Sequence, residues 1–190
     1  MGGEIMIGKK NIVFGFIYLV FTAALGPYML QTMFPDMGSA LQTKQKDVGY
    51  LQQLAANEFE NPETMEPLSA ENLGKANTRG ILALSLLDNA RTPINDMKGG
   101  PHAHGNLEAV LNIIAGLTLC FLAAPVLFKQ IISWVFILGA LLHSGMLYLR
   151  AFDVAFAGKL LYLGPWFVLA GLLLMGIAAI IWLRPEVVKD

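Results

Sequence analysis

Cysteine and charge are the two things that this chain has little of. Its 190 residues include one cysteine, Cys120, so no disulfide can form within the chain, and a buried apolar packing role suits a thiol inside an apolar run. Charged residues make up only 14% of the chain, and the formal net charge is -1. Because there is neither a basic face nor a block of like charge, we expect no nucleic-acid partner.

Apolar residues take the place of the missing charge. Hydrophobic residues make up 55% of the chain and the mean hydropathy is +0.56, which is too apolar for an ordinary soluble domain. Four runs are long enough to cross a bilayer as helices, at about 1.5 Å per residue. They cover approximately residues 11–34, 104–128, 131–152 and 162–183. The sequence therefore predicts an all-α integral membrane protein with four transmembrane helices in an antiparallel bundle and a tight turn at Lys129-Gln130.

The segment between the first two spans, residues 35–103, is polar and contains many proline, glycine, asparagine and acidic residues. Apolar residues recur at helical spacing in Lys46–Asn57 and again after Ser69, a candidate N-cap, until Thr92-Pro93 stops the pattern. We expect two short amphipathic helices that lie on the membrane surface or cap the bundle outside the cell.

Lysine and arginine predict the orientation. One side of the predicted spans carries Lys9, Lys10, Lys129, Arg184 and Lys189. The other side carries Arg150 and Lys159, together with the long polar segment, which exceeds the length over which charge biases insertion. Since cytoplasmic loops hold the excess of positive charge, both termini are predicted to face the cytoplasm of a multi-pass cell-membrane protein.

Histidine is the ionisable residue that the predicted spans do contain. His102 and His104 stand at the start of the second span, and His143 lies in the third span, nine residues before position 152. This puts His143 about 13 Å below the outer end of its span, at the depth of Asn112 on the second span. His104, Glu108 and Asn112 follow one another at one-turn spacing and share a helix face. We expect this polar stripe to face His143 rather than lipid.

These histidines have several interpretations. His102 and His104 could hydrogen-bond loop carbonyls at the interface, or they could belong to a metal, haem or proton site. His143 with Ser144 could make an interhelical hydrogen bond. A zinc site made of His102, His104, Glu108 and His143 requires both adjacent histidines to fold onto one ion.

Short motifs in the spans resemble a known family. The second span begins with Ala103-His104, with Asn112 downstream, the third contains residues 143–152, HSGMLYLRAF, and the last contains residues 164–171, GPWFVLAG. Together they resemble the styrene oxide isomerase family over the four spans, but not over the polar segment. The resemblance implies a small four-helix homotrimer with haem b bound between subunits, whose ferric iron acts as a Lewis acid that opens an epoxide to an aldehyde.

The resemblance also implies roles for particular residues. His104 becomes the axial haem ligand, with His102 beside it, because it follows Ala103 at the start of the second span as the family's ligand does. The family's asparagine lies closer to that ligand than Asn112 does here. Its third-span tyrosine falls at Leu147, one place before Tyr148. The candidate catalytic residues are therefore Asn112, His143 and Tyr148.

Three functions follow as hypotheses. In the isomerase, a small apolar epoxide-type substrate enters from the bilayer and His143 hydrogen-bonds its oxygen. In the alternative, His143 is a second axial ligand of a six-coordinate b-type cytochrome for electron transfer or sensing. The third is a non-catalytic subunit of a membrane complex. Candidate partners of the haem propionates are Arg79, Arg91 and Arg150.

Overall fold

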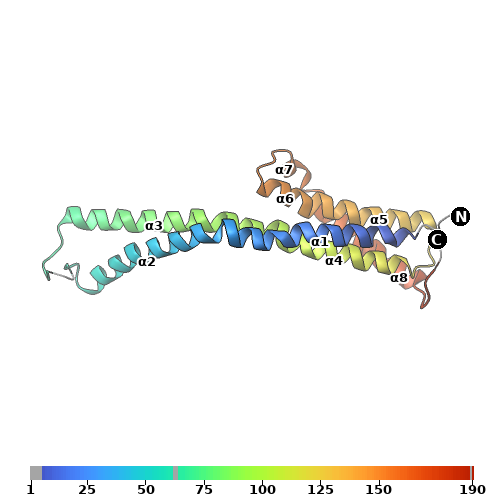
Figure 1. Ribbon diagram of the computed structural model, residues 1–190, viewed down its shortest axis with the longest axis horizontal. Coiled ribbons are helices and arrows are strands. Elements are labelled where there is room, and N and C mark those ends of the chain that lie inside the picture. The colour runs from blue at the N-terminus through green and yellow to red at the C-terminus, as the bar shows by residue number, and fades with distance from the viewer. Residues whose placement is uncertain (1–5, 62–63, 189) are drawn as a thin grey trace. The chain divides into compact units, whose positions relative to one another are not determined.

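A computed structural model describes residues 6–61, 64–188 and 190, and in this part of the chain the regular elements are all helical (Figure 1). Lys189, one of the residues used to predict orientation, lies outside it. The α-helices are α1 (Ile7–Thr32), α2 (Phe34–Ala56), α3 (Ala70–Met97), α4 (Ala103–Leu119), α5 (Val126–Ala140), α6 (Met146–Ala151), α7 (Ala157–Leu160) and α8 (Gly164–Trp182). Two π-helical segments are η1 (Lys98–His102) and η2 (Leu141–Gly145).

The helices form two compact units. The first unit comprises Met1–Gly26 and Asp96–Asp190, and the second comprises Pro27–Asn95. The first unit thus holds most of α1 and all of α4 to α8, whereas the second holds α2 and nearly all of α3.

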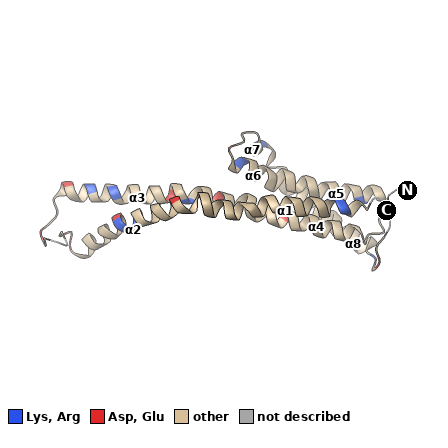
Figure 2. Cartoon of the chain, viewed as in Figure 1, with Lys and Arg blue, Asp and Glu red and all other residues tan. Residues whose placement is uncertain are grey.

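Three helical stretches are long and apolar enough to cross a membrane: Ile7–Thr32, Val126–Ala151 and Ala157–Trp182. They correspond to the first, third and fourth predicted spans and indicate a membrane protein. Charged residues are scarce along α1 and absent from α8, as Figure 2 shows. The fourth candidate, α4, has 17 residues.

The predicted turn between the second and third spans is wrong. Helix α4 ends at Leu119 and α5 begins at Val126, so Lys129-Gln130 lies inside α5 and not between helices. Pro125 explains the shift, because it adopts an extended conformation (φ -54°, ψ 139°) and disfavours helix at the residue before it. The prediction from hydropathy alone missed this break and continued the second span to residue 128.

Apolar packing joins α4, α5 and α8 in the first unit. Its buried centre consists of Ala115, Leu119, Leu122, Ile132, Phe136 and Ala178. Glycines bring the backbones close: a Cβ on Gly171 would lie 3.3 Å from the Phe136 ring, and one on Gly139 would lie 3.1 Å from the Val168 backbone nitrogen. Such small residues allow helices to associate where no hydrophobic effect drives them together.

Polar contacts hold one end of the first unit together. Lys129, which is 1% exposed, forms an ion pair with Asp190, and the Asp190 carboxylate also accepts a hydrogen bond from the Ile7 backbone N–H at 2.7 Å. Lys10 donates to the side chain of Gln130. The start of α1, the first turn of α5 and the chain's C-terminal residue therefore meet at one place.

The helices of the second unit are longer than predicted. Helix α2 has 23 residues and begins at Phe34, with Pro35 in its first turn, where proline is well tolerated. Helix α3 has 28 residues and continues through Pro93, so the predicted stop at Thr92-Pro93 is wrong. The N-cap prediction is confirmed, since the Ser69 hydroxyl accepts the Asn72 backbone N–H at 3.3 Å.

Candidate metal site in the first unit

Both histidine-bearing segments contain a π-helical turn. Segment η1 ends at His102, directly before α4, and η2 contains His143 and Ser144. Short π-helical turns inside α-helices are rare and frequently occur at functional sites, because the extra residue rotates the following side chains. Gly164 lets the start of α8 approach closely here, since a Cβ at this position would overlap the His143 backbone.

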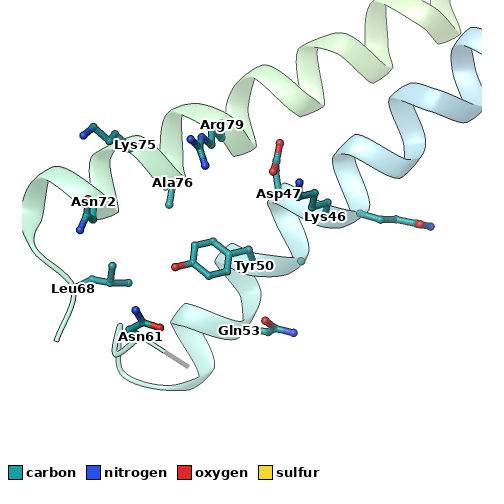
Figure 3. A pocket seen from close by; sticks show the side chains of 12 residues that line it. Lys46, Asp47, Tyr50, Gln53, Asn61, Leu68, Asn72, Lys75, Ala76 and Arg79 are labelled. Atoms are coloured by element: carbon teal, nitrogen blue, oxygen red, sulfur yellow. The ribbon is translucent and has the colours of Figure 1, made fainter. Parts of the chain in front are cut away.

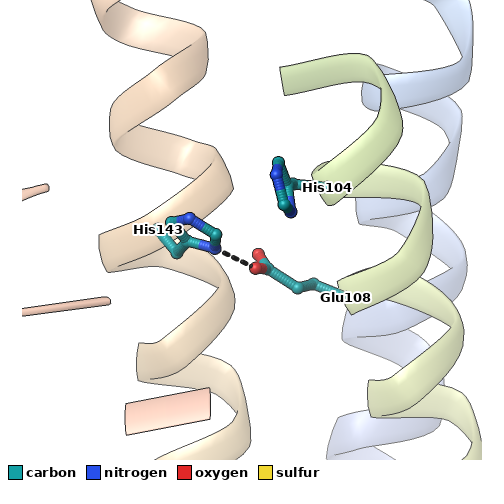
Figure 4. Close-up of side chains that lie close together, drawn as sticks. All are labelled: His104, Glu108 and His143. Carbon is teal, nitrogen blue, oxygen red and sulfur yellow. Dashed lines mark hydrogen bonds and ion pairs between the residues drawn. The ribbon is translucent and has the colours of Figure 1, made fainter. Parts of the chain in front are cut away.

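Three side chains converge beside these turns, as Figure 4 shows. His104 and Glu108 lie one turn apart on α4 and face His143 across the gap to η2. One donor atom from each of the three lies within 4.8 Å of the other two. The rings of His104 and His143 have centroids 4.7 Å apart and are inclined at 58°. The sequence correctly predicted that His143 meets the stripe of α4.

Glu108 is the centre of this group. Its side chain is 4% exposed, and its Oε1 accepts a hydrogen bond from His143 Nδ1 at 2.5 Å. Its Oε2 accepts from the Ser144 hydroxyl at 2.5 Å and from the Ser144 backbone N–H at 3.3 Å. A carboxylate in an apolar interior needs such partners, because unpaired burial costs several kcal/mol. With Nδ1 donating to Glu108, His143 keeps the lone pair of Nε2 for another ligand.

Tyr18 extends the contacts of the group to α1. Its hydroxyl lies 2.8 Å from the Ser144 hydroxyl and 3.3 Å from the Ala140 carbonyl. Glu108 is thus linked to three helical segments, through its own helix α4, through η2 and, by way of Ser144, through α1.

The donor set suits a transition-metal ion. Two imidazoles and one carboxylate are the ligands of many catalytic zinc sites, which leave a fourth position open. Ligands at about 2.0–2.1 Å from a tetrahedral ion lie roughly 3.3 Å from one another. One donor atom of each residue lies within 4.8 Å of the other two, so side-chain rotations would bring all three onto one ion.

In the observed arrangement, the two imidazole rings lie closer together than the axial ligands of one haem do. Imidazoles on opposite sides of one ion, with their nitrogens at about 2 Å, have ring centroids roughly 6 Å apart. The observed 4.7 Å leaves no room for a porphyrin between the rings. A haem with His104 as its single axial ligand avoids this restriction, because the His104 side chain is exposed.

The second histidine at the start of α4 does not join the group. His102 Nδ1 lies 2.9 Å from the Thr22 carbonyl oxygen of α1, and its ring lies near Gly26. The predicted zinc site of four residues is therefore wrong in one respect, because His102 is not one of the converging ligands. His102 does contact a backbone carbonyl, as one interpretation expected, but this carbonyl belongs to helix α1 and not to a loop.

Asn112 lies one turn below Glu108 and is 1% exposed. Its Nδ2 donates to the carbonyls of Glu108 (3.0 Å) and Phe136 (3.2 Å), and its Oδ1 accepts from Asn11 at 3.0 Å. Asn11 also bonds to Ser133. These contacts hold α1, α4 and α5 together, and they employ both polar atoms of the Asn112 amide.

The other predicted site residues are placed as follows. The Tyr148 ring packs on Phe152 with centroids 5.2 Å apart, on α6 and just beyond it. Arg150 is exposed in the last turn of α6. Arg79 and Arg91 belong to α3 in the second unit.

Two residues at the site were not among the predicted site residues. The sequence suggests only an interhelical hydrogen bond for Ser144, and it assigns no role at the site to Tyr18. The adjacency of Ser144 to His143 was a usable signal. Nothing in the sequence around Tyr18 indicates that its hydroxyl reaches Ser144, which is 126 positions away.

Comparison of the chain with family models, curated proteins and solved structures gives no significant match.

Proposed function

We propose that this protein is a membrane metalloprotein whose first unit binds a divalent transition-metal ion, Zn²⁺ being the best suited, through His104, Glu108 and His143. The observation that carries the proposal is the convergence of these three donors, from two helical segments, around a carboxylate that is 4% exposed. Ionisable groups inside membrane helices are costly and are usually retained for function.

The proposed membrane arrangement has four antiparallel spans: α1, α4, α5 and α8. Support comes from the order of contacts. Gly8 of α1 lies against Gly116 of α4, whereas Gly15 lies against Ala109, nearer the start of α4. Helix α4 spans about 26 Å at 1.5 Å per residue, and η1 adds length before it, so together they match a hydrocarbon core of about 30 Å.

The chemistry proposed for the site is Lewis-acid catalysis on an oxygen atom of a small apolar molecule. When bound, such an ion would polarise that oxygen or activate a water molecule. The chain's own residues hold the donors in place: Ser144 and Tyr18 fix one oxygen of Glu108, and Gly164 lets α8 support the His143 backbone. Exposure of His104, with Leu107 56% exposed beside it, favours entry of an apolar substrate from the bilayer.

Haem b with His104 as single axial ligand is the second candidate, together with the isomerase activity, the small epoxide and the homotrimer that the family resemblance implies. The observation that favours it is the exposure of the His104 ring, which would let a porphyrin lie between copies of the chain. A cytochrome with His104 and His143 of one chain as the two axial ligands is not supported by the 4.7 Å between their rings.

Metal analysis and one absorption spectrum of the purified protein test both candidates. We expect about one Zn²⁺ per chain, and after its removal Co²⁺ should produce visible absorption bands typical of histidine and carboxylate ligation. His104→Ala, Glu108→Gln and His143→Ala should each abolish this binding, whereas the matched control His102→Ala should keep it. A Soret band lost in His104→Ala would select haem b instead. Unchanged Co²⁺ binding in all three ligand variants would refute the metal site.

A further inference from the structure

A cavity lies entirely in the second unit, between α2 and α3, as Figure 3 shows. Its volume is about 720 Å³, within the range of about 300–1,000 Å³ that holds small ligands. Ligand pockets are usually lined by apolar groups. This one is lined mainly by polar side chains, including four amides and the phenol of Tyr50, so its walls favour a polar ligand.

Positive charges outnumber negative charges in the lining of this cavity. The lining contains three cations, Lys46, Lys75 and Arg79, and one carboxylate, Asp47, a formal balance of three minus one, or +2. Lys75 is engaged with Glu71 at 2.5 Å. Lys46 and Arg79 take part in no ion pair among the residues that the structure describes. Two cations from opposite walls are therefore available to an anion.

The geometry also restricts the shape of that anion. Arg79 points from α3 toward α2, and Tyr50 and Asp47 point from α2 toward α3 (Figure 3). A guanidinium group presents a planar set of N–H donors that suits phosphate oxygens. Asp47 accepts hydrogen bonds and repels anions, so the ligand must place donor groups beside it. Hydroxyl groups meet this requirement, and the amide side chains can bind them too.

We infer that this cavity binds a small phosphate ester that carries hydroxyl groups. The phosphate would lie between Arg79 and Lys46, and the hydroxyls would lie toward Asp47 and Tyr50. This chemistry is shared by soluble sugar or polyol phosphates and by the headgroup of phosphatidylglycerol. The inference does not depend on the metal site, because no residue of the cavity belongs to the first unit.

Calorimetric titration of the protein in detergent with glycerol 3-phosphate tests the inference. We expect saturable binding that Arg79→Gln weakens at least tenfold, because a charge-assisted hydrogen-bonded contact is lost. Arg91→Gln is the matched control, since Arg91 is also an exposed arginine of α3 but does not line the cavity. Inorganic phosphate, which lacks the alcohol groups, should bind more weakly, and Tyr50→Phe should weaken glycerol 3-phosphate several-fold. Arg79 is exposed, so its replacement should leave the far-ultraviolet dichroism unchanged.

Bilayer nanodiscs separate the two sources of the ligand. If phosphatidylglycerol in the nanodisc suppresses binding of glycerol 3-phosphate and phosphatidylcholine does not, the site takes a lipid headgroup. If neither lipid competes, the site takes a soluble ester. Absence of saturable binding to the wild type, or equal weakening by Arg79→Gln and Arg91→Gln, would overturn the inference.

Discussion

Glu108 is stabilised by neutral partners and one imidazole, with no lysine or arginine among its contacts in the described chain. In an apolar interior a carboxylate needs such a set of donors, because the cost of burying an unpaired charge is high. Two of the three donors come from a single residue, Ser144. Ser144 should therefore control how Glu108 is oriented toward a metal ion.

Replacing Ser144 with alanine removes the hydroxyl that holds Glu108 Oε2 and bonds to Tyr18. We expect Zn²⁺ affinity to fall by about 10- to 100-fold, as is usual when a residue that orients a metal ligand is lost. Competition with a chromophoric chelator measures the change. Ser133→Ala is a matched control, because Ser133 is an equally buried serine that contacts Asn11 rather than Glu108. Equal loss of affinity in both variants would indicate general destabilisation and contradict the proposed role.

Asn112 was predicted to be catalytic, and its contacts lead to a different expectation. Its amide joins α4 to Asn11 and to the Phe136 carbonyl. Asn112→Ala leaves these buried groups without their partner and should lower the free energy of unfolding by about 1–3 kcal/mol. Metal content per folded chain should stay the same. Denaturation in detergent and metal analysis of the folded fraction measure the two effects, and loss of metal with unchanged stability would restore the catalytic role.

At the level of helices, close backbone contact between α1 and α4 should be the most sensitive feature. A Cβ on Gly116 would lie 2.5 Å from the Gly8 carbonyl oxygen and 2.9 Å from the Ile12 backbone nitrogen. Neither group can rotate away, so Gly116→Ala should separate the helices and destabilise the first unit by about 1–3 kcal/mol. Gly176→Ala on α8 is the matched control, since no atom lies within 4 Å of its added Cβ. Thermal unfolding in detergent should show a lower midpoint for Gly116→Ala alone.

The sequence predicted the presence of the helices better than it predicted the residues at which they end. Long apolar runs identified Ile7–Thr32, Val126–Ala151 and Ala157–Trp182, because the bilayer length selects such runs directly. The break at residues 120–125 was missed because its residues are apolar. Lys129 was taken as a loop residue because it is charged, yet it is buried against Asp190, 61 positions away. No local pattern reports such a partner.

The candidate site likewise combines contacts that could be predicted from the sequence with contacts that could not. The one-turn spacing of His104 and Glu108 follows from helix geometry, and the depth of His143 follows from counting residues along a span. The contact of Tyr18 with Ser144 depends on how α1 packs against η2, and the direction of His102 depends on a carbonyl of α1. Such contacts between distant segments arise only when the helices are assembled.

For the whole molecule, the positions of the positively charged residues in the structure can be compared with the predicted membrane orientation. Lys10, Lys129, the start of α1 and Asp190 meet at one end of the first unit through the contacts of Gln130, Asp190 and Ile7. Exposed Lys159 follows α6, which lies at the opposite end of the Val126–Ala151 stretch. If positive residues stay in the cytoplasm, the end that contains Ile7 and Asp190 is the cytoplasmic one.

Single-cysteine labelling tests this orientation, and the chain offers a convenient background because Cys120 is its only cysteine and is buried. In Cys120→Ala protein, we expect a membrane-impermeant maleimide to reach Asn57→Cys and Lys159→Cys from outside the cell. Arg184→Cys should react only in inverted vesicles. All three positions are exposed, so failure to react reports the membrane barrier rather than burial. Reaction of Arg184→Cys from outside would invert the orientation. Reaction of Asn57→Cys and Lys159→Cys from opposite sides would instead rule out the four-span arrangement, because an even number of crossings must separate them.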